Sequence, residues 1–386
     1  MPEAFKYVID AAVGVALFFA LILVFVVDRF VLSGTPAVAA NTLKGVKVIG
    51  GQAKTKDGKR LRLAVTPTAK SRKLGSTVDE LWDDMGRLLK HDLKYEYEIV
   101  KPQEILDGRK KLKDYDVLFL TCAGGGEDLK DFLRQFVAEG GTLYASDWRY
   151  DAVAAAFPEM ASEKLKNEGD RQELAAQIVD PALSDALSAT TVHLKFDLPE
   201  WKTAAFEGPR VKVLMRGKYR INKSTQETTA PLMVKMSFGK GTVIFTSFHN
   251  EKQNSRTESE LLKYLVFSLV TAGVDAEVQG KMDESGFTPQ RSNLLSTPTR
   301  NQSTPPKTFE NMKKATLRFA LGFRNEGAKL RFNIKSPGGE QYTWEGESTV
   351  ILEVANAEAG AWTYTVTALE LPRDNFAFRV TVGEKK

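Results

Sequence analysis

Two short apolar runs of the chain each end on residues that could do chemistry. The first run, Gly141-Thr-Leu-Tyr-Ala-Ser146, ends on a hydroxyl, and the second, which starts at Thr242, ends at His249 and Glu251. An apolar run that begins after glycine and ends on polar groups is typical of a buried parallel strand, and open α/β sheets place their sites just beyond such strands. A nucleophile, a base and an orienting carboxylate are the parts of a hydrolytic triad. The spacing therefore indicates Ser146, His249 and Glu251 as candidate catalytic residues.

At these residues the chain resembles the class I glutamine amidotransferase-like superfamily, over roughly residues 60–275. That family carries its nucleophile at a tight turn after a central strand and a His-x-Glu after a late strand. Ser146 stands where the family usually has cysteine, and His249 and Glu251 match the His-x-Glu. An adjacent base can activate a hydroxyl, so serine is a workable replacement.

The family also has a glycine loop whose amides form an oxyanion hole. Gly124, Gly125 and Gly126, after the predicted strand 115–122, match that loop. The resemblance implies that backbone N–H groups near Gly125 and Asp147 would stabilise a developing negative charge. Three glycines before a helix could also cradle a phosphate, but the lysine of a P-loop and the spacing of a dinucleotide site are missing.

Other residues depart from the family pattern. A nucleophile turn needs small neighbours, yet Trp148 stands where a glycine is expected, and Tyr150 replaces the glutamine of amidotransferases. Without the usual cysteine, glutamine hydrolysis as the family performs it is not expected. The alternative interpretation makes Ser146 a turn cap and His249-Asn250-Glu251 a hydrogen-bonded strand end. We therefore favour a non-catalytic site over an acyl-transfer hydrolase.

Cys122, at the end of the strand before the glycine loop, is a second candidate nucleophile. A lone cysteine among apolar residues is more often a packing residue. It is the only cysteine of the chain, which excludes an internal disulfide and a cysteine-based metal site. His91 and His193 form no metal pair with His249 by spacing. We expect neither a metal nor another cofactor.

Predicted strands and helices alternate between residues 60 and 279. The predicted strands are 60–67, 95–100, 115–122 and 142–146, and the predicted helices are 76–91, 103–112, 127–139 and 258–270. Less regular strands follow at 193–197, 211–215 and 232–236. This alternation is typical of a parallel sheet with helices on both faces. We expect an α/β domain with a doubly wound, mostly parallel sheet, of the flavodoxin-like or amidotransferase-like kind.

The N-terminal 34 residues predict a single membrane anchor. Residues 11–27 carry no charge, and with residues up to 32 the apolar stretch reaches about 20 residues, enough to span a bilayer. A cleaved signal peptide is the alternative, since Ala37-Val-Ala39 has small residues at a cleavage spacing. Residues 35–59 predict a tether and hairpin. The side of the membrane stays open, because the loop charges conflict with the type of C-terminal module.

The C-terminal part predicts a flexible linker at 280–308 and an all-β sandwich at 309–386. The linker is rich in Ser, Thr, Pro, Asn and Gln, whereas short alternating runs separated by glycine turns follow it. Trp344 and Trp362 would allow a sugar-binding surface, but core tryptophans would explain them equally well.

A net charge of +5 without a strongly basic stripe does not predict a nucleic-acid partner. The sequence as a whole predicts a membrane-anchored, non-catalytic binding or scaffold protein with protein partners, as in a subunit of a membrane assembly. The alternative function is a serine hydrolase of the peptidase or amidase kind.

Overall fold

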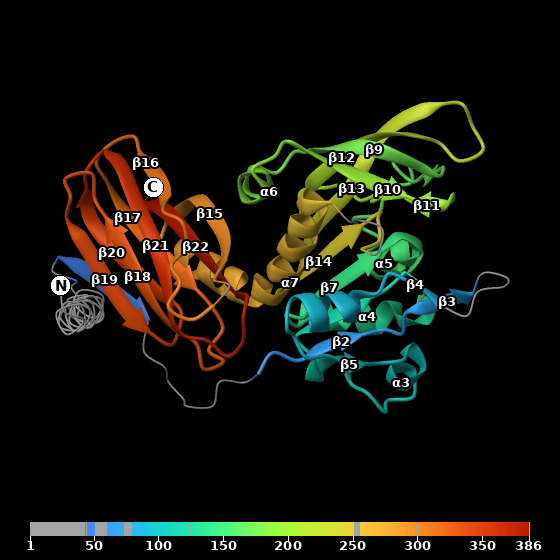
Figure 1. Cartoon of the computed structure of the whole chain (residues 1–386), viewed down its shortest axis with the longest axis horizontal. Coiled ribbons are helices and arrows are strands. Elements are labelled where there is room, and N and C mark those ends of the chain that lie inside the picture. Colours follow the sequence, from blue (N-terminus) through green and yellow to red (C-terminus); the bar gives the residue numbers. More distant parts are fainter. Residues whose placement is uncertain are drawn as a thin grey trace, which may run out of the picture. The chain divides into compact units, whose positions relative to one another are not determined.

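The protein is described by a computed structural model that covers residues 43, 45–50, 60–72, 79–122, 126–250, 255–297 and 299–385 (Figure 1). Of these residues, 43% lie in strands and 23% in helices, so the protein is mostly β. The strands form one sheet of nine, one of five and one of four. Two further pairs are β3 (Ala69–Arg72) with β4 (Asp79–Trp82), and β8 (Glu168–Gly169) with β11 (Trp201–Lys202).

One half of the nine-stranded sheet is parallel, in the order β14-β7-β6-β2-β5. These strands are β2 (Leu63–Val65), β5 (Glu98–Ile99), β6 (Val117–Leu120), β7 (Thr142–Ser146) and β14 (Gly241–Thr246). All but β5 are buried along their whole length, as expected for strands that are covered on both faces. The residues that follow β6, β7 and β14 therefore meet at one edge of the sheet.

The other half of this sheet is antiparallel and continues from β14 in the order β13-β12-β9-β10. These strands are β9 (Gln172–Ile178), β10 (Thr191–Phe196), β12 (Val211–Arg220) and β13 (Glu227–Phe238). The prediction of a doubly wound, mostly parallel sheet is therefore wrong, because the sheet is mixed. The physical reason is that an alternating pattern identifies a strand but does not fix the direction of its neighbour.

Helices cover both faces of the parallel half. On β6, Val117 and Phe119 pack into one core with α7, whereas Leu118 and Leu120 pack into the opposite core with α4. The helices are α2 (Met85–Arg87), α3 (Pro102–Leu106), α4 (Lys130–Ala138), α5 (Tyr150–Ala156), α6 (Pro181–Leu187) and α7 (Arg256–Asp283). A π-helical segment forms η1 (Leu88–Asp92), and 3₁₀-helical turns form η2 (Leu112–Asp114), η3 (Glu127–Leu129) and η4 (Asp147–Arg149).

The longest helix among the described residues, α7, runs along β7 and β14 (Figure 1). A capping box starts it: the Ser255 hydroxyl accepts the N–H of Glu258 at 3.2 Å, and the Glu258 carboxylate accepts the N–H of Ser255 at 2.6 Å. Such reciprocal bonds satisfy two N–H groups that the first helical turn leaves free.

The C-terminal strands and β1 form a β-sandwich of sheets β1-β20-β17-β22-β15 and β16-β21-β18-β19. The strands are β1 (Val46–Gly50), β15 (Phe287–Thr297), β16 (Lys307–Asn311), β17 (Ala315–Gly322), β18 (Lys329–Lys335), β19 (Gln341–Gly346), β20 (Val350–Ala357), β21 (Gly360–Glu370) and β22 (Phe376–Lys385). Trp344 and Trp362 are 3% and 1% exposed in the core between the sheets. They are core residues and offer no sugar-binding surface.

Two segments differ from the expected linkers. Within the predicted tether at 35–59, β1 pairs with β20, and within the predicted linker at 280–308, β15 pairs with β22. Small and polar residues suggested a linker, but they also fit an edge strand, which buries only part of its surface.

No helix in the described part of the chain combines the length and the apolar character that a membrane crossing requires. This finding corrects the predicted transmembrane helix and single-pass membrane location. Residues 11–32, on which that prediction was based, lie outside the described residues.

Candidate functional site

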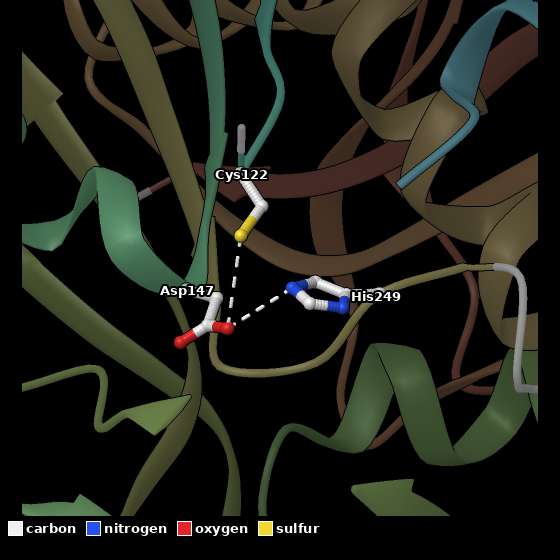
Figure 2. A group of neighbouring side chains, drawn as sticks. All are labelled: Cys122, Asp147 and His249. Carbon is white, nitrogen blue, oxygen red and sulfur yellow. Dashed lines mark hydrogen bonds and ion pairs between the residues drawn. The ribbon is translucent and has the colours of Figure 1, made fainter. Parts of the chain in front are cut away.

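Three side chains from three neighbouring strand ends meet at the carboxyl edge of the parallel half-sheet (Figure 2). Cys122 follows β6, Asp147 follows β7 and His249 follows β14. The strand order β6-β7-β14 puts Asp147 on the middle strand. The carboxyl edge of an open sheet is where such folds place their ligands, so the meeting point is a candidate site.

The Asp147 carboxylate lies between the other two side chains. Its Oδ2 atom is 3.0 Å from His249 Nε2 and 3.8 Å from Cys122 Sγ. The donor atoms of all three residues lie within 4.8 Å of one another. Cys122 and Asp147 are buried, and the His249 side chain is 11% exposed. We call these three residues the Cys-Asp-His cluster.

Asp147 reaches this position through an unusual backbone conformation. Its φ of 46° lies in the left-handed region, which costs free energy for a residue with a side chain, although aspartate tolerates it better than most. The other carboxylate oxygen, Oδ1, accepts the backbone N–H of Lys202 at 2.6 Å. This bond fixes the carboxylate and leaves Oδ2 directed at Cys122 and His249.

Two buried charged side chains hold the backbone of Cys122. Asp83 Oδ2 accepts the N–H of Cys122 at 2.9 Å, and Arg149 Nε donates to the carbonyl oxygen of Cys122 at 2.7 Å. Asp83 comes directly after β4 and, like Asp147, has a left-handed backbone, with φ at 56°. Both peptide groups of Cys122 are thus anchored, and its thiol is held in place beside Asp147.

The predicted nucleophile Ser146 is not part of this cluster. It is fully buried, and its hydroxyl donates its one proton to Asp83 Oδ2 rather than to a histidine. Ser146 is the last residue of β7, and the side chain that turns into the site belongs to its neighbour Asp147. His249, predicted as the base, does lie in the site. Glu251 lies outside the described residues.

The predicted oxyanion loop is described only in part. Gly124 and Gly125 lie outside the described residues, whereas Gly126 has a φ of 114° and is the N-cap residue of η3. Asp147 was predicted to contribute its backbone N–H, but the structure brings its carboxylate into the site. Trp148, expected to crowd the turn, is 48% exposed and donates from Nε1 to the Glu200 carbonyl oxygen at 3.2 Å.

The surroundings of Cys122 favour its protonated form. Burial raises the pKa of the thiol more than the contact with His249 lowers it, and the nearby charges of Asp147 and Asp83 raise it further. A cysteine nucleophile needs the opposite shift, since the thiolate is the reactive form. In a hydrolytic triad the imidazole would also stand between the nucleophile and the carboxylate. Here one oxygen of the carboxylate contacts both the thiol and the imidazole.

The cluster presents a sulfur, a nitrogen and an oxygen donor, which are the ligand types of transition-metal sites. The sequence missed this combination because metal pairs were sought between histidines and among several cysteines. The signal was present all the same. Cys122 ends one predicted strand and Asp147 directly follows the next predicted strand of the same parallel sheet, which places both at the same edge.

Comparison with known proteins gives likenesses of fold only. No protein-family model matches the chain, and no curated protein matches it. Among solved structures, a ThuA-like protein from Bacteroides uniformis is 13% identical, with a TM-score of 0.38, over 57% of this chain and 96% of that one. A ThuA-like protein from Parabacteroides merdae is 12% identical, with a TM-score of 0.36, over 55% and 90%. A β-galactosidase from Bacillus circulans is 13% identical, with a TM-score of 0.32, over 70% and 36%.

The ThuA-like proteins are amidotransferase-like in fold. At these identities and scores the comparisons assign no function to this chain.

Proposed function

We propose that residues 60–279 form an amidotransferase-like domain that binds a ligand at the carboxyl ends of β6, β7 and β14 without acyl-transfer chemistry. The observation that carries this proposal is the position of Asp147. Its carboxylate stands at the turn after the central strand, where the resemblance places a nucleophile, and is 3.0 Å from the only histidine of the site.

An acyl-transfer enzyme needs a hydroxyl or thiol whose proton can pass to a base. The Ser146 proton is directed to Asp83, and the Cys122 thiol is directed to Asp147. The Nε2 atom of His249 lies 3.0 Å from the Asp147 carboxylate. These three contacts support a site in which no nucleophile is activated.

The backbone strain at the site costs folding free energy, which indicates that the site has a function. Asp83 and Asp147 both adopt left-handed backbone conformations, and each such outlier costs on the order of 1–3 kcal/mol. Both carboxylates are buried at the same strand ends, linked through the hydrogen bonds of Cys122 and Ser146. Strain of this kind gathers at active sites and ligand clamps, which supports ligand binding here. Protein partners remain a prediction from the sequence.

Activity-directed probes test the proposal on the full chain. A fluorophosphonate reports an activated serine, iodoacetamide reports an accessible thiolate, and p-nitrophenyl acetate reports general esterase activity. We expect no fluorophosphonate on Ser146, no alkylation of Cys122 faster than that of a free thiol, and ester hydrolysis equal in the wild type and in Ser146→Ala.

His249→Gln is the matched control variant for these assays, because it removes the only imidazole that either nucleophile could use. Saturable labelling of Ser146 or Cys122 that disappears in His249→Gln would show an activated nucleophile and overturn the non-catalytic proposal. Equal, slow reaction of both proteins supports it.

A further inference from the structure

We propose that Cys122, Asp147 and His249 together bind a divalent transition-metal ion, with zinc as the ion that fits the three donors best. The inference rests on the proposed ligand-binding function and names the ligand class of the same site. It starts from the convergence of three donor atoms of different types, all within 4.8 Å of one another.

The spacing of the donors suits one shared ion. Zinc bonds of about 2.0–2.3 Å to oxygen, nitrogen and sulfur place tetrahedral ligand atoms about 3.3–3.6 Å apart. The oxygen–nitrogen distance between Asp147 and His249 is 3.0 Å, and the oxygen–sulfur distance between Asp147 and Cys122 is 3.8 Å. Shifts of a few tenths of an ångström would bring both separations into the range for zinc.

The donor types select the class of ion. Magnesium and calcium prefer oxygen ligands alone, whereas a thiolate with an imidazole and a carboxylate suits zinc and its neighbours in the first transition row. On binding, Cys122 would give its proton to solvent and coordinate as the thiolate. One divalent ion then balances the negative charges of Cys122 and Asp147, and neutral His249 supplies the third donor.

The groups behind the ligands already hold them in place. The Lys202 N–H fixes the free oxygen of Asp147, and Asp83 and Arg149 fix the two peptide groups of Cys122. Outer contacts of this kind orient the ligands of metal sites and raise their affinity. These contacts hold Cys122 and Asp147 in positions from which both could coordinate the ion.

Three protein ligands leave a fourth tetrahedral position, which zinc sites of this type give to water or to a small molecule. The ion would therefore supply the point at which the proposed ligand attaches. This links the metal to the binding function without requiring any acyl transfer.

The test uses the full chain without an affinity tag, so that its own three histidines are the only ones present. Calorimetric titration with zinc measures stoichiometry and affinity, and titration with cobalt gives a spectrum. A sulfur-to-cobalt charge-transfer band can arise only from Cys122, because the chain has no other cysteine. We expect one ion per chain, a charge-transfer band and visible bands typical of tetrahedral cobalt.

Ligand variants and matched controls make the test specific. Cys122→Ser, Asp147→Asn and His249→Gln should each weaken zinc binding at least about 100-fold, because loss of even an outer contact costs 10–100-fold. Asparagine tolerates the left-handed backbone at position 147, so that variant keeps the fold. His91→Gln and His193→Gln should bind zinc as the wild type does. Thermal unfolding without metal checks that each variant is folded.

The outcomes separate the two proposals. Absence of stoichiometric zinc and cobalt binding in the wild type, or binding without the charge-transfer band, overturns the metal site. A loss of zinc affinity in His91→Gln as large as that in the ligand variants also overturns the metal site. If the metal fails while Ser146 and Cys122 stay unreactive toward the probes above, the ligand-binding function stands without a metal. If Ser146 or Cys122 is labelled in a way that depends on His249, the proposed non-catalytic function itself fails.

Discussion

Two of the buried polar clusters in the described part of the protein are built on opposite principles. In the sandwich, Arg318 of β17 stands directly opposite Glu353 of β20, with Arg318 Nη2 2.8 Å from Glu353 Oε2. Arg318 also donates to the Lys281 carbonyl oxygen at 3.2 Å and lies 4.0 Å from the centre of the Phe287 ring. At the edge of the nine-stranded sheet, the Cys-Asp-His cluster gathers three donors that could share one cation.

The two clusters differ in whether their charges are balanced by their own side chains. The pair of Arg318 and Glu353 brings its own opposite charges, and regular strand pairing places them without backbone strain. The Cys-Asp-His cluster depends on two left-handed aspartates, Asp83 and Asp147, and has no permanently positive side chain among its three donors. A buried group that is complete in itself is structural, whereas one that costs strain and offers metal ligands is a candidate for function.

The largest expected effect on unfolding free energy comes from removing Glu353 from its ion pair with Arg318. Glu353→Ala leaves the guanidinium of Arg318, whose side chain is 7% exposed, without a counter-charge. Removal of one partner of a buried ion pair costs about 3 kcal/mol or more of unfolding free energy. Urea unfolding of the full chain measures this loss, and zinc affinity should not change.

Two controls sharpen that prediction. Lys313→Ala removes the exposed partner of Glu384 and should cost less than about 1 kcal/mol, as surface pairs do. The double variant Arg318→Met with Glu353→Leu should be more stable than Glu353→Ala, because no charge is left buried alone. A double variant that is less stable than the single one would contradict the view that the unpaired charge is the cause.

The next largest effect comes from zinc binding to the Cys-Asp-His cluster. Zinc at 100 times its dissociation constant should raise the unfolding free energy by about 2.7 kcal/mol, if it binds only the folded chain. Because the two clusters belong to different sheets, the same gain is expected in Glu353→Ala. Urea unfolding with and without zinc measures the gain, and Cys122→Ser should show little of it. A gain that persists in Cys122→Ser would place the ion elsewhere.

The fold could be predicted from the sequence where local pattern decides it. Mostly apolar runs such as 115–122 and 142–146 predicted the central strands, and the alternating runs after residue 309 predicted the later strands of the sandwich. The pattern could not show that β12 and β13 would pair antiparallel beside β14. The predicted helix at 76–91 also failed in part, because β4 forms at Asp79–Trp82 by pairing with β3, and tertiary pairing overrides helical periodicity.

The candidate nucleophile predicted from the sequence is one residue away from the Cys-Asp-His cluster. The sequence located the strand ends and His249, but it chose Ser146 instead of Asp147. Successive side chains near a strand end point in opposite directions. An error of one residue therefore replaces a side chain that points into the site with one that points away from it. Periodicity could not reveal the left-handed turn at Asp147, which decides between them.

The smallest expected effect separates these two neighbours. Ser146→Ala removes one hydrogen bond to Asp83, which keeps the N–H of Cys122, so we expect a loss of about 1.5 kcal/mol in unfolding free energy. Zinc affinity should fall by less than about tenfold, since Ser146 touches no ligand atom directly, whereas Asp147→Asn removes a ligand and should cost at least about 100-fold. Urea unfolding and cobalt titration of the two variants measure both effects. If Ser146→Ala lost as much zinc affinity as Asp147→Asn, Ser146 would belong to the site, as the sequence predicted.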